Sequence, residues 1–358
     1  MNYTESNSWN RTLTRQLSRR AAIRGLGLAG LGLGAATVLG CGGGSEDKPK
    51  VEPPPEVTAL RMPLSTPLCE TAMFLAEKYL AEEGFTEVKF IPYQAPTVPW
   101  MLVSSGEADF GVDNLSLLLR ADVGEPLTFL AGFHTGCGAW VGNDSIKSAA
   151  DFKGRTIGVG GTDPLVNFDY LATLMFLANA GLNPARDVTF VTRPGPLAQL
   201  TPPFDEGKFD GFWAGLPVLY QARAAKLGHE ISNMMMDKPW SENYCCGVGA
   251  NRNFVQKNPV ATKRALRALM KASDEAESQP TAAARYVVDK GYRPNYDDVV
   301  QSFKEMGHNR WREMDHAASA RFWLRSLQAA GLLKGAPEKV ISDGVNLSFI
   351  NELRKAKV

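Results

Sequence analysis

Short apolar runs alternate with amphipathic stretches from Val57 onward, and this alternation limits the possible folds more than any other feature of the chain. Apolar runs bounded by turn residues predict buried strands, whereas apolar residues at helical spacing predict helices. Strands are predicted at Val57–Met62, Glu87–Ile91, Ala108–Val112, Leu127–Phe133, Gly138–Val141, Arg155–Val159, Val188–Val191, Phe209–Phe212 and Tyr244–Ala250. Helices between them are predicted at Pro67–Glu83, Val98–Ser105, Leu115–Arg120, Pro164–Ala180 and Leu216–Leu227. The alternation predicts an α/β fold with largely parallel sheets.

The pattern changes after Asn251, where only helices are predicted. These helices cover Pro259–Ser278, Thr281–Lys290, Asp315–Ala330 and Asn346–Lys355. The outline is therefore one α/β lobe, a second α/β lobe and a helical C-terminal return. Two crossings between the lobes are expected near residues 134–147 and 237–246, which assigns 57–136 and 245–358 to lobe 1 and 137–244 to lobe 2.

The first 40 residues read as an export signal, which is excluded from the fold. A polar stretch that carries Arg11, Arg15, Arg19 and Arg20 precedes an uncharged run from Gly25 to Leu39, which is dominated by Gly, Leu and Ala. As a helix this run would cover only about 22 Å of a hydrocarbon core of about 30 Å, so a signal is favoured over a transmembrane anchor. Ser18-Arg19-Arg20-Ala21-Ala22-Ile23-Arg24 resembles the twin-arginine export motif, with Ala22 in place of the usual aromatic residue; an ordinary secretory signal is the alternative.

A lipid anchor is predicted at the end of this signal. Val38-Leu39-Gly40-Cys41 resembles a lipobox, in which the chain is cut before a cysteine whose sulfur receives diacylglycerol. Residues 41–56 are rich in Gly, Pro and charge, and are expected to form a flexible linker that holds the folded domain off a membrane. Removal of residues 1–40 takes away five Arg and one Glu, which leaves 34 basic and 37 acidic residues and a net charge near −3. This balance gives no indication of a nucleic-acid partner.

Four segments in order give the folded part a resemblance to a known family. They are Ser104-Ser105-Gly106-Glu107-Ala108-Asp109-Phe110-Gly111, Ala150-Asp151-Phe152-Lys153-Gly154-Arg155-Thr156-Ile157-Gly158-Val159, Gly181-Leu182-Asn183-Pro184 and Glu206-Gly207-Lys208-Phe209-Asp210-Gly211-Phe212. Together they resemble the nitrate, sulfonate and taurine type of periplasmic solute-binding protein, which includes pyrimidine-precursor-binding members and serves ABC importers.

The resemblance implies a type II periplasmic binding protein fold with mixed sheets and a two-strand hinge. It implies that a small polar or anionic solute is held between the lobes and delivered to a permease and ATPase complex. It further implies a protein that is monomeric, has no cofactor and is not an enzyme. Open parallel sheets also bind ligands at the loops that follow their strands, where helix N-termini supply N–H groups.

The first lobe is expected to contribute polar side chains from three such loops. Ser65 and Thr66 precede the first helix, Thr97 precedes the second helix, and Asp113 and Asn114 follow the third strand. Each of these residues could instead be a helix cap, which is the commoner role of such side chains.

The second lobe and the first crossing supply the other candidates. Gly161, Thr162 and Asp163 lie in a loop that resembles the family's anion-facing loop, although Asp163 would repel an anion if it faced inward. Trp213 is expected to form an aromatic wall for a solute, or to be a core residue with a partner for its indole N–H. His134 is expected either to bind the solute or to satisfy a backbone carbonyl.

Four cysteines remain after lipidation, and export to an oxidising compartment makes a disulfide plausible. Cys137 lies on one crossing and Cys245 and Cys246 lie near the other, so a bond from Cys137 to either of them would fasten the hinge. A metal site of His134 with these cysteines is the alternative; it is not expected, because the C-x-x-C spacing of zinc sites is missing.

Two other functions remain open. The chain has no G-x-S-x-G, H-E-x-x-H or P-loop motif. The family nevertheless resembles a pyrimidine-forming enzyme with a Cys-rich motif, of which Cys245-Cys246 is a faint echo. An exported ligand-sensing protein is the other alternative. The sequence thus predicts a lipid-anchored protein, periplasmic or on the cell surface, whose fold alone does not fix its role.

Overall fold

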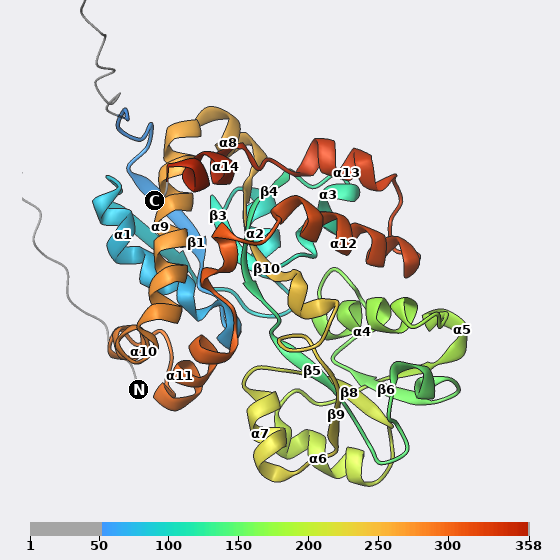
Figure 1. Cartoon of the computed structure of the whole chain (residues 1–358). Helices are drawn as coiled ribbons and strands as arrows, with labels where there is room; N and C mark the ends of the chain where they lie inside the picture. Colours follow the sequence, from blue (N-terminus) through green and yellow to red (C-terminus); the bar gives the residue numbers. More distant parts are fainter. Residues whose placement is uncertain (1–51, 357–358) are drawn as a thin grey trace, which may run out of the picture. The chain divides into compact units, whose positions relative to one another are not determined.

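The computed structural model describes residues 52–356, which belong to one compact unit that begins at Glu52 (Figure 1). The predicted export signal, the lipobox at Cys41 and most of the predicted linker lie outside the described residues. Within the described part, ten strands form three sheets, and helices surround these sheets.

The largest sheet is five-stranded and is built only from the middle of the chain. Its strands are β5 (Gly138–Gly142), β6 (Thr156–Val159), β7 (Thr189–Thr192), β8 (Gly211–Gly215) and β9 (His229–Asn233). They lie in the order β7-β6-β8-β5-β9, in which β6 is parallel to β7 and β8 while β5 is antiparallel to β8 and β9. In Figure 1, α4 (Phe168–Asn179) and α5 (Pro184–Asp187) lie above this sheet, and α6 (Leu197–Asp205) and α7 (Val218–Ala225) lie below it.

The other two sheets combine the start of the chain with a later strand. The parallel pair is β1 (Ala59–Pro63) with β2 (Glu87–Ile91). The second sheet places β10 (Tyr244–Asn251) between β3 (Phe110–Asn114) and β4 (Leu127–Thr135), antiparallel to both. All residues of β4 and β10 are buried, which is why both read as continuous apolar runs. The prediction of largely parallel sheets is wrong for this sheet, because the chain returns to it after the five-stranded sheet is complete.

Two connections join the five-stranded sheet to the sheet of β3, β10 and β4. The first is the short step from β4 through Gly136 and Cys137 into β5, and the second runs from β9 through η3 (Trp240–Glu242) into β10. Gly136 has φ of 40°, and a side chain there would overlap the backbone of Met234 and Met235 on the second connection. The glycine therefore lets the two connections pass in close contact. The α/β fold with mixed sheets is confirmed, and the lobe boundaries stay a prediction.

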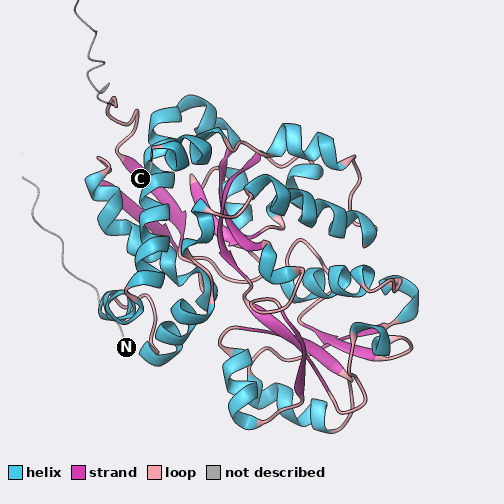
Figure 2. Cartoon of the chain, viewed as in Figure 1, coloured by secondary structure: helices cyan, strands magenta, loops and turns pink. Residues whose placement is uncertain are grey.

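Helices cover the sheets of the first part and make up the C-terminal part (Figure 2). The first group is η1 (Leu68–Leu75), α1 (Ala76–Glu82), α2 (Pro99–Ser105) and α3 (Leu117–Asp122). The short 3₁₀ helix η2 (Ala149–Phe152) lies against the five-stranded sheet, where Phe152 packs beside Gly211 of β8. The C-terminal group is α8 (Arg252–Lys257), α9 (Pro259–Ser278), α10 (Pro280–Asp289), α11 (Tyr296–Glu305), η4 (Asn309–Arg312), α12 (His316–Ala329), α13 (Pro337–Gly344) and α14 (Ser348–Lys355). The Asn251, Asn295 and Asp315 side chains cap α8, α11 and α12.

Several predicted boundaries differ from the structure. The segment predicted as one helix from Pro67 begins as the 3₁₀ helix η1 and becomes α-helical only at Ala76. The helix predicted from Pro164 begins at Phe168, because the preceding residues form turns. Strand β9 and helices α5, α6, α8, α11 and α13 were not predicted. Helix α6 was not recognised in the sequence because it contains Pro202 and Pro203, and proline is unfavourable inside a helix.

Helix α9 binds the end of the predicted linker. The carboxylate of Glu52 contacts Arg267 and Lys263, and the carboxylate of Glu56 accepts hydrogen bonds from the first backbone N–H groups of α9. Arg267 also forms an ion pair with the buried Glu83. Residues 52–56 therefore contact α9, and the linker boundaries stay a prediction.

No helix within residues 52–356 is long and apolar enough to cross a membrane.

The imidazole of His316 is buried between the sheet and the C-terminal helices. Its Nδ1 accepts a hydrogen bond from the Gly132 backbone N–H at 2.9 Å, and its Nε2–H donates to the Trp311 carbonyl at 2.9 Å. The ring stacks on Tyr244, with ring centroids 5.0 Å apart. These contacts fit one neutral tautomer, and burial lowers the pKa of His316 to about 4.

We expect the contribution of His316 to the free energy of unfolding, taken as the difference between the protein and His316→Asn, to fall as the pH drops from 6.5 to 4.5. Over this range the imidazole of His316 becomes protonated in the unfolded chain but stays neutral in the folded chain. The contribution of His316 to the free energy of unfolding therefore falls by about 2–3 kcal/mol. Urea unfolding of the protein and of His316→Asn at several pH values measures this loss. Asparagine keeps an acceptor for Gly132 but has no such proton uptake. An equally steep fall in the variant would contradict the assignment.

Candidate functional site

A cavity of about 150 Å³ lies where β3 and β10 of one sheet approach β8 of another. Its lining residues come from η1 and the residue before it, β3, β10, the first connection, the start of α4, and the end of β8. They are Pro67, Cys69, Glu70, Asp113, Asn114, Cys137, Phe168, Trp213, Gly215, Leu216 and Cys246. A smaller hollow of about 20 Å³ shares Asp113, Asn114 and Phe168 with this cavity. Segments that lie far apart in the sequence therefore meet at one cavity.

The register of the strands determines which side chains of the sheet lie beside the cavity. Cys246 in the central strand β10 lies opposite Asn114 in β3 and opposite His134 in β4. Residues directly opposite in neighbouring strands project from the same face of a sheet. A register shift between Tyr244 and Cys246 leaves Cys245 without a partner in β4. Such a bulge redirects side chains, and here it brings both cysteines into the cluster beside the cavity.

Two buried carboxyl groups form the polar part of the cavity wall. Burial, and then the nearby charge of Asp113, raises the pKa of Glu70 well above its usual value. Burial also raises the pKa of Asp113 to about 6, although hydrogen bonds from Glu70 and from Asn114 oppose the rise. The Ser65 hydroxyl donates to Glu70, and the backbone and side chain of Asn114 donate to Asp113. The pair can accept hydrogen bonds from a solute, and Glu70 can also donate one.

Aromatic rings form the apolar part of the wall. Trp213 and Phe168 meet edge to face, with ring centroids 5.2 Å apart. The buried indole Nε1 of Trp213 has no hydrogen-bond partner. An unpaired buried donor is costly, so a Trp that lines a cavity with its N–H unpaired is a candidate for contact with a bound molecule.

Arginine side chains hold the loops around the cavity without lining it. The guanidinium of Arg193 donates to Asp169 at 3.1 Å and to the carbonyl of Trp213 at 2.9 Å. The guanidinium of Arg120 in α3 donates to the carbonyl of Leu165 and pairs with Glu125 at 2.7 Å. Leu165 lines the smaller hollow. Arg120 therefore links the part that carries β3 to the loop before α4.

Three of the ten predicted site residues line the cavity: Asp113, Asn114 and Trp213. Asp113 and Asn114 are the last residues of β3, and Trp213 lies within β8 instead of after it. Ser65 is buried behind Glu70 and does not cap the first helix, which begins after Pro67 without a side-chain cap.

The other predicted site residues do not line the cavity. They are Thr66, Thr97, Gly161, Thr162, Asp163 and His134. The Asp163 carboxylate accepts from the backbone N–H of Leu165 and so stabilises a turn. His134 is buried in β4, where its Nδ1 lies 3.1 Å from the Thr135 carbonyl and its Nε2 has no partner. The expectation that His134 satisfies a carbonyl therefore holds for one ring nitrogen only.

Sequence reasoning missed several lining residues, chiefly Glu70, Cys69 and Phe168. Glu70 is a charged residue in the otherwise apolar run Leu68–Leu75, and this was a usable signal. Buried acids are uncommon without a partner, so such a position deserved a functional reading. Cys69 and Phe168 look like ordinary core residues in the sequence, and only the tertiary contacts bring them to the cavity.

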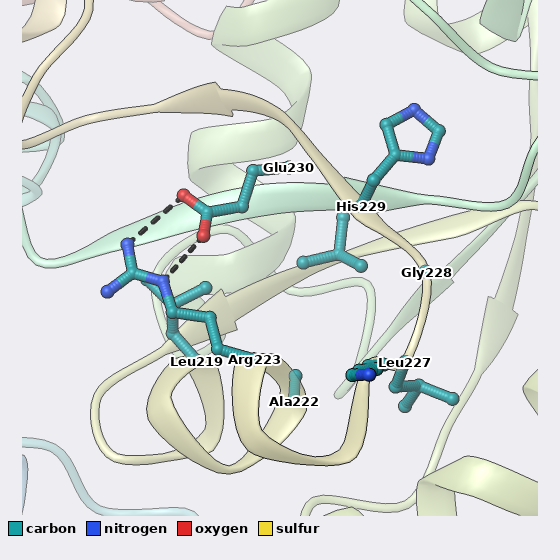
Figure 3. Close-up of a pocket in the computed structure, with 9 residues that line it drawn as sticks. Leu219, Ala222, Arg223, Leu227, Gly228, His229 and Glu230 are labelled. Atoms are coloured by element: carbon teal, nitrogen blue, oxygen red, sulfur yellow. Dashed lines mark hydrogen bonds and ion pairs between the residues drawn. The ribbon is translucent and has the colours of Figure 1, made fainter.

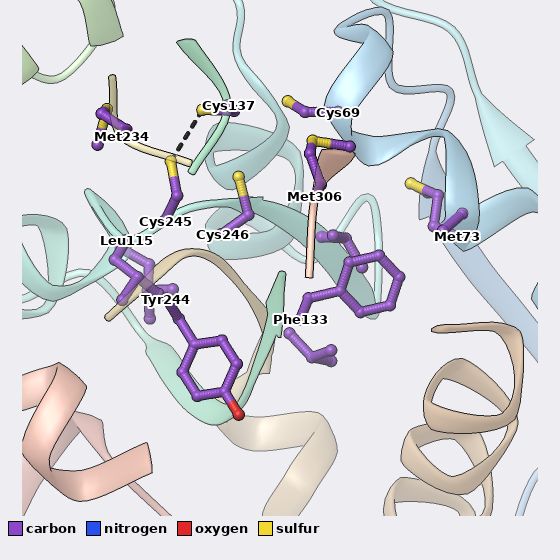
Figure 4. Packing of buried hydrophobic residues seen from close by; sticks show 14 of the residues in the cluster. Cys69, Met73, Leu115, Phe133, Cys137, Met234, Tyr244, Cys245, Cys246 and Met306 are labelled. Atoms are coloured by element: carbon purple, nitrogen blue, oxygen red, sulfur yellow. Dashed lines mark hydrogen bonds between the residues drawn. The ribbon is translucent and has the colours of Figure 1, made fainter. Parts of the chain in front are cut away.

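The four cysteines of the described residues are buried and unbonded, and they gather in one cluster (Figure 4). The Sγ atoms of Cys137 and Cys245 are 2.8 Å apart. The disulfide from Cys137 stays a prediction, and this proximity selects Cys245 over Cys246 as its partner.

A second hollow, of about 260 Å³, lies between α7 and β9 (Figure 3). Its charged residues Arg223 and Glu230 already pair with each other through two hydrogen bonds of 2.6 and 3.2 Å. None of the predicted site residues lines it. Lys226, which also lines the hollow, is exposed to solvent, and none of the lining residues has a buried polar atom without a partner.

The sequence model of the NMT1/THI5-like family matches residues 71–283. The structure resembles the nitrate-binding protein NrtA from Synechocystis (TM-score 0.62, 15% identity, 84% of this chain and 89% of that one). It also resembles the aliphatic sulphonate-binding protein SsuA from Escherichia coli (TM-score 0.58, 17% identity, 78% of this chain and 95% of that one). A third similar structure is that of the desulfurization enzyme DSZB (TM-score 0.55, 16% identity, 84% of this chain and 99% of that one). No curated protein sequence matches the chain. The fold is that of periplasmic binding proteins, which at least one enzyme shares.

Proposed function

The chain belongs to the NMT1/THI5-like family, and from this premise we propose that it is the solute-binding component of an ABC importer. The observation that carries the proposal is one cavity lined both by Trp213, whose buried indole N–H has no partner, and by two buried carboxyl groups. A pocket with apolar walls and a few convergent polar groups is the usual form of a small-molecule site. The sulphonate- and nitrate-binding proteins with the same fold support the same role.

The cavity chemistry narrows the solute within the sulfonate, nitrate, taurine and pyrimidine class. Glu70 and Asp113 line the cavity, while no arginine or lysine does. Carboxyl groups favour N–H donors and repel an isolated anion. Phe168 and Trp213 offer apolar surface to a ring or a short alkyl chain. We therefore favour a solute with an amino or ammonium group, such as an aminopyrimidine or taurine, over nitrate or a simple alkanesulfonate.

Closure around the solute is part of the proposal. Residues 57–136 and 245–358 would form one lobe and 137–244 the other, with hinges at the two connections between the sheets. Arg120 would stabilise the closed form through its bond to Leu165. Closing two half-sites excludes water and strengthens each polar contact, and reopening on the importer reverses this.

The cellular setting is proposed from the N-terminal sequence. The signal in residues 1–40 would export the protein by the twin-arginine or general secretory route, and Cys41 would carry the lipid anchor. The monomer would then lie in the periplasm or at the cell surface beside its permease and ATPase. An exported sensor would use the same cavity, and a neighbouring permease gene would favour the importer.

A thermal-shift screen of the protein against taurine, aminopyrimidines, alkanesulfonates and nitrate tests the proposal. A solute at 100 times its dissociation constant should stabilise the fold by about 2.7 kcal/mol, or about 5 °C. We expect this from an aminopyrimidine or taurine and not from nitrate. Product analysis of the same mixtures separates binding from turnover, because a DSZB-like enzyme would consume its ligand.

Substitutions locate the binding and supply the control. Asp113→Asn keeps the shape of the side chain but removes the charge, and should weaken binding of the amino solute ~30-fold or more. Asp163→Asn is the matched control, because Asp163 lies outside the cavity. Equal binding by nitrate and the amino solutes, or no effect of Asp113→Asn, would refute the proposed solute class.

A further inference from the structure

The most unusual cluster of side chains in the described residues is the set of cysteines and histidine beside the cavity. One ligand atom each from Cys69, His134 and Cys246 lies within 4.8 Å of the others, and all three residues are buried. Sulfur atoms that share a tetrahedral zinc ion are about 3.8 Å apart, given a Zn–S distance of about 2.3 Å. Small side-chain adjustments therefore suffice to close this set around an ion.

His134 has the hydrogen bonding of a metal ligand. Its Nδ1 lies 3.1 Å from the carbonyl of Thr135, which fixes the proton on that nitrogen. The lone pair then lies on Nε2, which is buried and has no partner. Because Cys246 is directly opposite His134 in the sheet, the imidazole and the thiol project from the same face. A buried basic nitrogen beside thiols needs a partner, which either a thiol proton or a cation shared with the thiolates supplies.

The other two cysteines have a separate arrangement. The Sγ atoms of Cys137 and Cys245 contact each other at 2.8 Å, whereas Cys246 belongs also to the set with Cys69 and His134. Cys69 and Cys246 line the cavity and His134 does not. The set of three therefore borders the cavity, which gives an ion a route to it.

We propose that Cys69, Cys246 and His134 bind one Zn²⁺-class divalent cation in the cavity wall. Two thiolates and a neutral imidazole around a divalent ion carry no net charge, so the buried site avoids an uncompensated charge beside Glu70 and Asp113. A monovalent copper ion would leave one negative charge there, which disfavours it. Three protein ligands leave a fourth tetrahedral position for water or for a donor atom of a molecule in the cavity. This site does not depend on the proposed solute.

Zinc titration of the fully reduced protein against a chromophoric chelator tests the site. We expect one Zn²⁺ per chain, with affinity lowered ~100-fold or more by Cys69→Ser, by Cys246→Ser and by His134→Gln. The double variant Cys137→Ser with Cys245→Ser is the matched control and should keep the affinity within a few-fold. Replacement of zinc by Co²⁺ should give thiolate-to-metal charge-transfer absorption in the protein and in this control.

The outcomes separate the metal site from its alternatives. Absence of stoichiometric binding, or an affinity that the three single variants leave unchanged, overturns the proposal. Equal loss in the Cys137 and Cys245 control also overturns it, because the ion would then lie among Cys137, Cys245 and Cys246. Melting temperatures of the metal-free variants show whether each is folded, and Co²⁺ spectra of the folded ones give a readout independent of affinity. Zinc binding without any stabilising solute would support the site and count against the importer function.

Discussion

Replacing Arg293 with methionine is expected to destabilise the protein by about 3–5 kcal/mol and to abolish solute binding. The guanidinium is buried, and it donates hydrogen bonds of 2.8 Å to the hydroxyl of Thr71 and to the carbonyls of Tyr292 and Pro67. It also lies over the ring of Phe74, 5.0 Å from the centroid. Methionine keeps much of the volume but leaves these acceptors without a donor. The cavity depends on the same contacts, because Pro67 lines it directly before η1.

Urea unfolding measures the loss of stability, and the thermal-shift screen measures solute binding. Arg293→Lys should be intermediate, because an ammonium keeps the charge but cannot reach three divergent acceptors. Arg325→Met is the matched control, since Arg325 is exposed on α12. A stability of Arg293→Met within about 1 kcal/mol of the unaltered protein would show that the buried guanidinium does not hold η1 in place.

Gly132→Ala is expected to cost about 3 kcal/mol or more, at or beyond the upper end of the range for overpacked cores. A methyl group on Gly132 would overlap the ring of Tyr244, which is fully buried. The ring cannot move aside easily, because it stacks on His316 and its hydroxyl donates to the carbonyl of Arg310. The substitution therefore forces apart β4 and the start of β10. Thermal or urea unfolding, or the soluble yield if the variant fails to fold, reports the effect.

Gly195→Ala provides the comparison for Gly132→Ala. A methyl group on Gly195 would meet no atom within 4 Å, so we expect little change in stability. Similar stabilities for the two variants would mean that β4 and β10 pack less tightly than the structure shows.

Local sequence patterns predicted the elements more reliably than their pairing. The apolar runs of β4 and β10 identified both strands, but nothing in either run shows that β10 inserts antiparallel between β3 and β4. That arrangement depends on contacts between residues more than 100 positions apart. Helix α6 was hidden by Pro202 and Pro203, whose cost is outweighed by burial of Leu200 and Phe204.

In the candidate site, too, local sequence patterns predicted some residues, whereas others depend on tertiary contacts. Asp113, Asn114 and Trp213 were predicted because polar or aromatic residues at strand ends are typical of binding sites in this fold class. Glu70 was missed because it lies inside an apolar run, and Cys69 because a buried thiol is usually only a packing residue. The predicted loop residues Gly161, Thr162 and Asp163 do not line the cavity, since turns before Phe168 place the ring of that residue there instead.

The account rests on the claim that the cavity between Glu70, Asp113, Phe168 and Trp213 is where the protein captures its solute. A crystal structure with the most stabilising compound of the screen tests this claim most directly. We predict density for the compound in this cavity, with a donor on Asp113 or Glu70 and an acceptor facing the indole N–H of Trp213. Density for the compound elsewhere, such as in the hollow beside Arg223 and Glu230, with this cavity unaltered, would contradict the account.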